Sequence, residues 1–138
     1  MPLPVNAFKI EREWKCAGLK CAVVQSREAA YRCGYVCVPL THPAFGKMYD
    51  DVAVEIHGGL TFAEIDSDGS GWWFGFDCAH YHDATYDPDI DLASLSDEAK
   101  SFMTVIRRMP MPGEHFWTQL EVEGECESLA RQLSEIII

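Results

Sequence analysis

Residues 57–83 read HGGLTFAEIDSDGSGWWFGFDCAHYHD and hold three of the five histidines, two of the four tryptophans and five of the ten glycines. Val52–Ile56 leads into this stretch and Trp72–Phe76 lies inside it, and both runs are typical of β-strands. A polar cluster follows each run, His57-Gly58-Gly59 after the first and Asp77-Cys78-Ala79-His80 after the second. If the two strands are adjacent and antiparallel, His57 can approach the second cluster.

Two more strands are predicted on the N-terminal side, over Leu19–Gln25 and Tyr31–Pro39. Ser26–Ala30 is either the turn of a β-hairpin or, because Arg-Glu-Ala-Ala favours helix, part of a short helix over Ser26–Tyr31. Residues 1–18 are expected to be an irregular lead-in with a little strand or turn, since two prolines near the start discourage a helix. Residues 63–71 (AEIDSDGSG) favour a turn or an exposed loop.

Helical signals come late in the chain. Ser96-Asp97-Glu98 opens one helix after an acidic connection over residues 81–95, and apolar residues at helical spacing predict another over Leu120–Ile136. A short strand over His115–Leu120 is a further expectation. The chain is therefore predicted to be one α+β domain over residues 1–138, with a mainly antiparallel β-sheet over 19–80 and a helical part over 96–138. The late helix and the C-terminal helix are expected to pack on one face of the sheet.

Length and composition narrow the class of protein. With 138 residues and 48% hydrophobic composition, the chain can bury a core of its own. No apolar run approaches the roughly 20 residues that a membrane helix needs, and the start lacks the features of a signal peptide. We expect a cytoplasmic protein with no membrane association, whose six cysteines are reduced and buried.

The net charge of -11 is unevenly distributed. Residues 48–99 contain thirteen Asp or Glu and no Lys or Arg, and the remainder is close to neutral. Nonspecific nucleic-acid binding is therefore not expected, because it needs a basic surface. An acidic surface can hold cations, dock on a basic partner or simply keep the protein in solution.

The polar clusters contain candidate metal ligands and catalytic groups. His57, Cys78, His80 and Asp83 carry side chains that can bind a divalent ion such as zinc, although their spacing matches no standard zinc motif. Alternatively, Cys78 could act as a nucleophile with His57 or His80 as its base. In that case Gly58 and Gly59 could present backbone N–H groups to an oxyanion. The simplest alternative is that these residues are structural.

The same polar clusters could also line a pocket for a small-molecule ligand. His57, Gly58, Gly59 and Asp77 would form one side of it. Trp72 could stack on a flat ligand, and His42 could reach the pocket from its Pro- and Gly-containing loop. Core packing is the alternative role for Trp72.

Several segments resemble a family of small uncharacterised proteins encoded by bacteriophages and prophages. The specific ones are His57-Gly58-Gly59-Leu60-Thr61 and Trp72-Trp73-Phe74-Gly75-Phe76-Asp77-Cys78-Ala79-His80. Weaker likeness extends from about Leu19 to the C-terminal helix. The resemblance implies a phage origin and action in the cytoplasm of an infected bacterium, and it implies no reaction.

Three functions are thus predicted from the sequence. The first is a phage accessory protein whose HGG/DCAH pocket binds a small-molecule ligand or a metal ion. The second is an acidic inhibitor that binds a host protein, for example a host-defence factor. The third is a hydrolase that depends on a metal or on a Cys/His pair in the same pocket.

Overall fold

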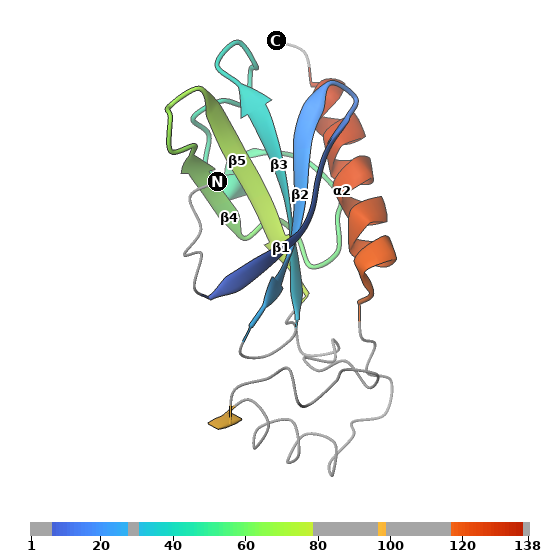
Figure 1. Cartoon of the computed structure of the whole chain (residues 1–138). Helices are drawn as coiled ribbons and strands as arrows, with labels where there is room; N and C mark the ends of the chain where they lie inside the picture. The colour runs from blue at the N-terminus through green and yellow to red at the C-terminus, as the bar shows by residue number, and fades with distance from the viewer. Residues whose placement is uncertain (1–6, 28–30, 79–96, 99–116, 137–138) are drawn as a thin grey trace.

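The structure is a computed structural model and describes residues 7–27, 31–78, 97–98 and 117–136. Five strands form one antiparallel sheet in the order β1-β2-β3-β5-β4 (Figure 1). The strands are β1 (Phe8–Cys16), β2 (Leu19–Ser26), β3 (Arg32–Pro39), β4 (Phe62–Ile65) and β5 (Gly71–Asp77). A short 3-10 helix, η1 (Tyr49–Asp51), lies between β3 and β4, and the helix α2 (Gln119–Ser134) packs mainly over β2 and β3. The predicted α+β class is confirmed.

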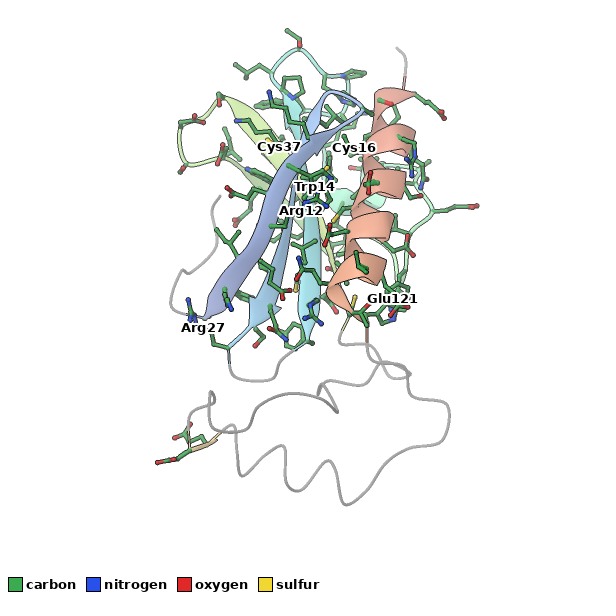
Figure 2. The ribbon with its side chains drawn as sticks, turned by 45° about the vertical axis from the view of Figure 1, so that its right-hand side comes forward. Arg12, Trp14, Cys16, Arg27, Cys37 and Glu121 are labelled. Atoms are coloured by element: carbon green, nitrogen blue, oxygen red, sulfur yellow. The ribbon has the colours of Figure 1, made fainter. Side chains whose placement is uncertain are left out.

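The core lies between α2 and the sheet. Val122, Cys126 and Leu129 of α2 are fully buried and meet Val23, Phe74 and other residues on one face of the sheet. The spacing of these helical residues is that of a single apolar stripe, as the sequence predicts. Figure 2 shows Arg12, Trp14 and Cys16 along the seam between β1 and α2.

The other face of the sheet, which we call the outer face, carries a second cluster. Its members alternate along the strands with those that face α2, as the two-residue period of a strand requires. The buried residues of this cluster are Ala22, Val24, Cys33, Tyr35, Cys37 and Trp73. Tyr35 stacks edge-on against Phe62 at 5.2 Å between ring centroids, which joins β3 to the edge strand β4.

The first strand corrects the prediction of an irregular lead-in. Residues 8–16 form the nine-residue strand β1, which pairs with β2 along its length. A register shift between Ile10 and Arg12 interrupts the alternation of side chains that identifies a strand in sequence. The same shift lets Glu11 and Arg12, although adjacent, form ion pairs with Arg32 and Glu123 respectively. Ala17 and Gly18, with φ of 52° and 79°, then form a two-residue turn whose twist suits the hairpin.

The expected strand over Val52–Ile56 is also wrong. Its apolar residues Val52, Val54 and Ile56 pack on the core, but the segment pairs with no strand among the described residues. Gln132 of α2 replaces the missing strand: its carboxamide accepts from the Glu55 backbone N–H at 2.7 Å and donates to the Glu55 carbonyl at 2.8 Å. The strand that pairs with β5 on the side away from β3 is instead β4, which overlaps the first residues of the segment 63–71 predicted to be a turn or exposed loop.

Most of the other predicted strands and helices fall on described residues and can be compared with the structure. The strands predicted over 19–25, 31–39 and 72–76 and the C-terminal helix are confirmed with small changes of bounds. β2 and β3 form the expected hairpin, closed by the Ser26 N–H donating to the Tyr31 carbonyl. Leu120 belongs to α2 and not to a short strand. The acidic connection over 81–95 and most of the helix expected after Ser96 lie outside the described residues.

Candidate functional site

The HGGLT segment contacts the end of β5 through Thr61. The Thr61 hydroxyl donates to Asp77 at 3.1 Å, and the Thr61 backbone N–H donates to the Gly75 carbonyl at 2.8 Å. Gly58 and Gly59 have φ of 67° and 78°, a conformation that other residues rarely adopt. These two glycines turn the chain from the extended segment 52–56 into β4, which gives them a structural role independent of any oxyanion.

His57 lies against the start of α2. Its imidazole stacks on the indole of Trp117, with 4.2 Å between ring centroids and a tilt of 32°. Trp117 directly precedes Thr118, the N-cap of α2, whose hydroxyl accepts from the Glu121 backbone N–H. The half-buried His57 ring thus helps to anchor the helix start on the loop that carries the double glycine.

Cys78 does not face an accessible site. It is 1% exposed within the core beneath α2, and its backbone N–H donates to the Arg32 carbonyl at 3.0 Å. A nucleophile or metal ligand must be reachable, so this position favours a packing role. His80 and Asp83 lie outside the described residues. Within the described ranges, no three His, Cys, Asp or Glu side chains gather as a metal site would require.

The other two residues of the predicted pocket, His42 and Trp72, lie elsewhere. Trp72 is at the start of β5, five residues before Asp77, which separates the two by about 17 Å along the strand. Its indole N–H donates to the Lys47 carbonyl at 2.9 Å, and its ring packs on Phe45. His42 Nδ1 accepts from the Ala44 backbone N–H, so Nε2 carries the proton and donates to the Leu133 carbonyl at 2.8 Å. Both residues hold the loop after β3 in place.

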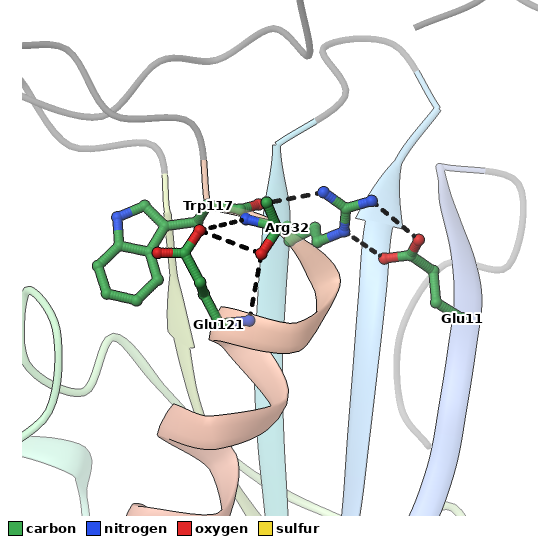
Figure 3. A network of polar contacts seen from close by, with 5 residues as sticks. Glu11, Arg32, Trp117 and Glu121 are labelled. Carbon is green, nitrogen blue, oxygen red and sulfur yellow. Dashed lines mark hydrogen bonds and ion pairs between the residues drawn. The ribbon is translucent and has the colours of Figure 1, made fainter. Parts of the chain in front are cut away.

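A buried ion pair that the sequence does not predict joins Arg32 to Glu11 beside Trp117, the residue on which His57 stacks (Figure 3). Arg32 donates to both carboxylate oxygens of Glu11, at 2.6 and 3.1 Å, and to the Trp117 carbonyl at 3.0 Å. The side chains of Arg32 and Glu11 are only 10% and 11% exposed. The pair joins β1, β3 and the chain just before α2. The only signal in the sequence is an arginine within an apolar strand.

A second ion pair fixes the middle of α2. The Arg12 guanidinium donates to Glu123, which is buried, and lies over the Trp14 ring at 4.6 Å from its centroid. This contact combines a charge-assisted hydrogen bond with a cation–π interaction. It holds β1 to the helix.

None of the six cysteines forms a disulfide, and Cys16 is the one that is more than slightly exposed. Burial raises the pKa of Cys21 and of Cys33 to about 12, with Cys16 and Asp77 adding to the respective effects. Burial also raises the pKa of Cys37 to about 11 and that of Cys126 still further. These four thiols therefore stay protonated at neutral pH and are poor nucleophiles.

Apolar and acidic side chains are exposed together at one end of the sheet. Met48, Tyr49 and Ile65 are 50%, 40% and 49% exposed. Trp72 connects them, because it bonds the Lys47 carbonyl and lies directly opposite Ile65 in the β4–β5 pair. Residues 48–51 and 64–68, which we call the acidic corner, contain five acidic residues and no Lys or Arg: Asp50, Asp51, Glu64, Asp66 and Asp68.

Comparisons with protein-family models, with curated proteins and with solved structures find no match to this chain. Among the described residues, no helix combines the length and the hydrophobicity that crossing a bilayer requires. What the protein does must therefore be inferred from its own residues.

Proposed function

We propose that this chain is a small binding protein of bacteriophage origin that docks through its acidic corner on a basic surface of a bacterial host protein. The exposure of Met48, Tyr49 and Ile65 among carboxylates carries the proposal. Apolar and aromatic side chains provide most of the binding energy in protein interfaces, and a charged rim selects the partner and speeds association. A host-defence factor is the class of target that a phage origin favours.

The position of the corner suits docking. β4 is four residues long and forms one edge of the sheet, so the backbone on the side away from β5 pairs with no strand of the described sheet (Figure 1). Glu64 is exposed on this strand, and charge on a short edge strand discourages nonspecific pairing with other sheets. A basic partner surface complements the corner, whereas another copy of this acidic chain does not.

The test starts with the full chain immobilised and exposed to a bacterial lysate. The captured protein is identified by mass spectrometry and purified, and its Kd is measured with purified chain. We expect the Asp50→Lys/Ile65→Ala variant to weaken binding by about tenfold or more, because it reverses one charge and removes one apolar contact. The identified partner is expected to have a basic surface.

The matched control is Glu135→Lys/Leu120→Ala, which makes the same kinds of change at exposed positions at the two ends of α2. This variant should bind as the unmodified chain does. Equal binding by both variants, equal loss in both, or no captured protein at all contradicts the proposal. Thermal unfolding of each variant excludes loss of fold as the cause.

A second candidate is a ligand pocket near His57 and Asp77, favoured by the bond between Thr61 and Asp77 that places the HGGLT segment beside the end of β5. If a metal belongs there, elemental analysis of the purified chain should find one divalent ion per chain, lost in His57→Ala. A metal-free chain whose thermal midpoint is unaffected by added zinc or manganese counts against both this metal site and a metal-dependent hydrolase.

A further inference from the structure

The two edges of the described sheet differ in how readily they can pair with a further strand. The edge strand β1 carries a register shift between Ile10 and Arg12, and it also contacts α2. The other edge strand, β4 (Phe62–Ile65), pairs with β5 in one continuous register. Irregularities such as that of β1 protect a sheet edge from further pairing, so β4 is the edge that another strand can extend.

Two residues of β4 direct their backbone polar groups away from β5. The backbone N–H of Asp66, just after β4, donates to the Gly71 carbonyl at 2.8 Å. Because these groups alternate in direction along an antiparallel strand, those of Glu64 also point toward β5, and those of Ala63 and Ile65 point away. No hydrogen bond within the described part of the chain uses the backbone N–H of Ala63 or Ile65. Their N–H and C=O groups are therefore open to a neighbouring strand.

The side chains of β4 determine which kind of strand this edge favours. Glu64 is exposed and lies on the outer face, opposite Trp73 of β5. Ile65 is 49% exposed and lies on the other face, opposite Trp72. A lysine or arginine beside Glu64 and an apolar residue beside Ile65 would each form a favourable cross-strand pair. A segment that alternates basic and apolar residues complements both.

We propose that the partner protein supplies a basic, extended segment that pairs antiparallel with β4 and so extends the five-stranded sheet. The inference rests on the proposed function, since Glu64 and Ile65 belong to the acidic corner, and it specifies how the partner binds. Apolar residues of the segment would exchange backbone hydrogen bonds with Ala63 and Ile65, and a basic residue would face Glu64 between them. A second copy of the chain is a poor occupant, because antiparallel pairing of two β4 strands would bring two Glu64 carboxylates together.

The test uses the full chain labelled with ¹⁵N and a short capped peptide that alternates valine and lysine. Its Kd is measured by titration, and hydrogen-exchange NMR is recorded with and without it. We expect the amides of Ala63 and Ile65 to exchange about tenfold or more slowly in the complex. The Glu64 amide, which faces β5, should change little. The same peptide with glutamate in place of lysine should not bind, because like charges would then lie opposite each other.

Two matched changes separate strand pairing from simple charge attraction. The peptide N-methylated at its valines keeps every charge but loses the N–H groups that would donate to β4, so it should bind about tenfold or more weakly. Ile65→Pro removes one outward N–H at an edge position that tolerates proline and should weaken binding of the unmethylated peptide similarly, whereas Ile65→Val should not. Thermal unfolding checks the fold of the proline variant, and the N-methylated peptide decides the matter if that variant is unfolded.

Three results overturn strand addition: no binding of the valine–lysine peptide, equal binding of its N-methylated form, or binding that leaves exchange at Ala63 and Ile65 unchanged. None of these contradicts docking through the acidic corner, which is judged by capture of a host protein and by its response to Asp50→Lys/Ile65→Ala. A captured protein that responds to that double variant but binds Ile65→Pro as tightly as Ile65→Val supports docking and overturns strand addition.

Discussion

Gly34 has no side chain, and this allows α2 to pack close to β3. A Cβ atom at this position would lie 2.4 Å from Phe76 Cζ and 2.6 Å from Cys126 Sγ. Both distances are shorter than real Cβ contacts, so only glycine lets α2 approach β3 this closely. A glycine within a strand pattern indicates such an approach in the sequence, but it cannot indicate which element approaches.

Replacing Gly34 with alanine should lower the free energy of unfolding by about 1–3 kcal/mol, the usual cost of overpacking a core. Gly124→Ala is the control, because Gly124 lies in α2 with open space where a Cβ would stand. That change should stabilise the protein by about 0.5–1 kcal/mol through helix propensity. Urea unfolding of both variants decides the matter, and a tolerated Gly34→Ala would show that the helix lies farther from the sheet.

The Arg32–Glu11 pair is the second feature at this scale. Arg32→Met should destabilise the protein by about 3–5 kcal/mol, because it leaves the Glu11 carboxylate buried without its partner. Glu11→Leu/Arg32→Met removes both charges and should recover most of the loss. Chemical denaturation measures both effects. If the double variant is no more stable than Arg32→Met, the hydrogen bond from Arg32 to the Trp117 carbonyl matters more than the ion pair.

Because the thiols are buried, the free energy of unfolding should fall as the pH rises through the alkaline range. Burial raises the pKa of Cys33 from 9.0 to about 12, so between these values the folded chain keeps a proton that the unfolded chain releases. The stabilisation from this thiol is complete below pH 9 and is lost as pH rises toward 12. Thermal unfolding from pH 8 upward should show the decline, and Cys33→Ala should reduce its slope. An equal slope in Cys33→Ala would mean that other groups cause it.

At the scale of elements, the strands in the middle of the sheet could be predicted because they are continuous apolar runs, and α2 because its apolar residues repeat with one helical period. Val36 and Phe74 lie in strands whose residues are buried on both faces, and α2 repeats its apolar residues at helical spacing. β1 could not be predicted, since the register shift near Glu11 breaks its alternation. Residues 52–56 alternate as a strand does, but the side chain of Gln132, and not a neighbouring strand, bonds the backbone of Glu55. The sequence does not indicate this contact.

Gln132→Leu tests whether the Gln132 side chain holds the segment 52–56 in the way that a neighbouring strand would. It removes two hydrogen bonds to the Glu55 backbone and should cost about 1–3 kcal/mol. The Glu55 amide should also exchange with solvent faster, which hydrogen-exchange NMR can measure. Gln119→Leu, at the first residue of α2, is the control and should leave that amide unchanged. Unaltered exchange in Gln132→Leu would mean that packing of Val54 and Ile56 alone holds the segment.

At the scale of the whole molecule, the predicted site is only partly brought together. The sequence predicts a contact through pairing of residues 52–56 with β5, whereas the observed contact joins Thr61 to Asp77 and accompanies the pairing of β4 with β5. The separation of Trp72 from Asp77 follows from the length of the predicted strand between them. The position of His42 could not be predicted, because the sequence does not show at which end of the sheet the loop after β3 lies. Cys78 resembles a site residue in sequence but is part of the core. The acidic corner depends on a link through Trp72 between segments far apart in the chain.

Docking through the acidic corner is tested most directly by the salt dependence of the Kd for the identified host protein. The account predicts that binding weakens steeply as ionic strength rises, since added salt screens exposed charges. It also predicts a shallower dependence for Asp50→Lys/Ile65→Ala than for the unmodified chain or for Glu135→Lys/Leu120→Ala. A Kd that is independent of salt, or the same salt dependence in all three proteins, would contradict binding through this surface.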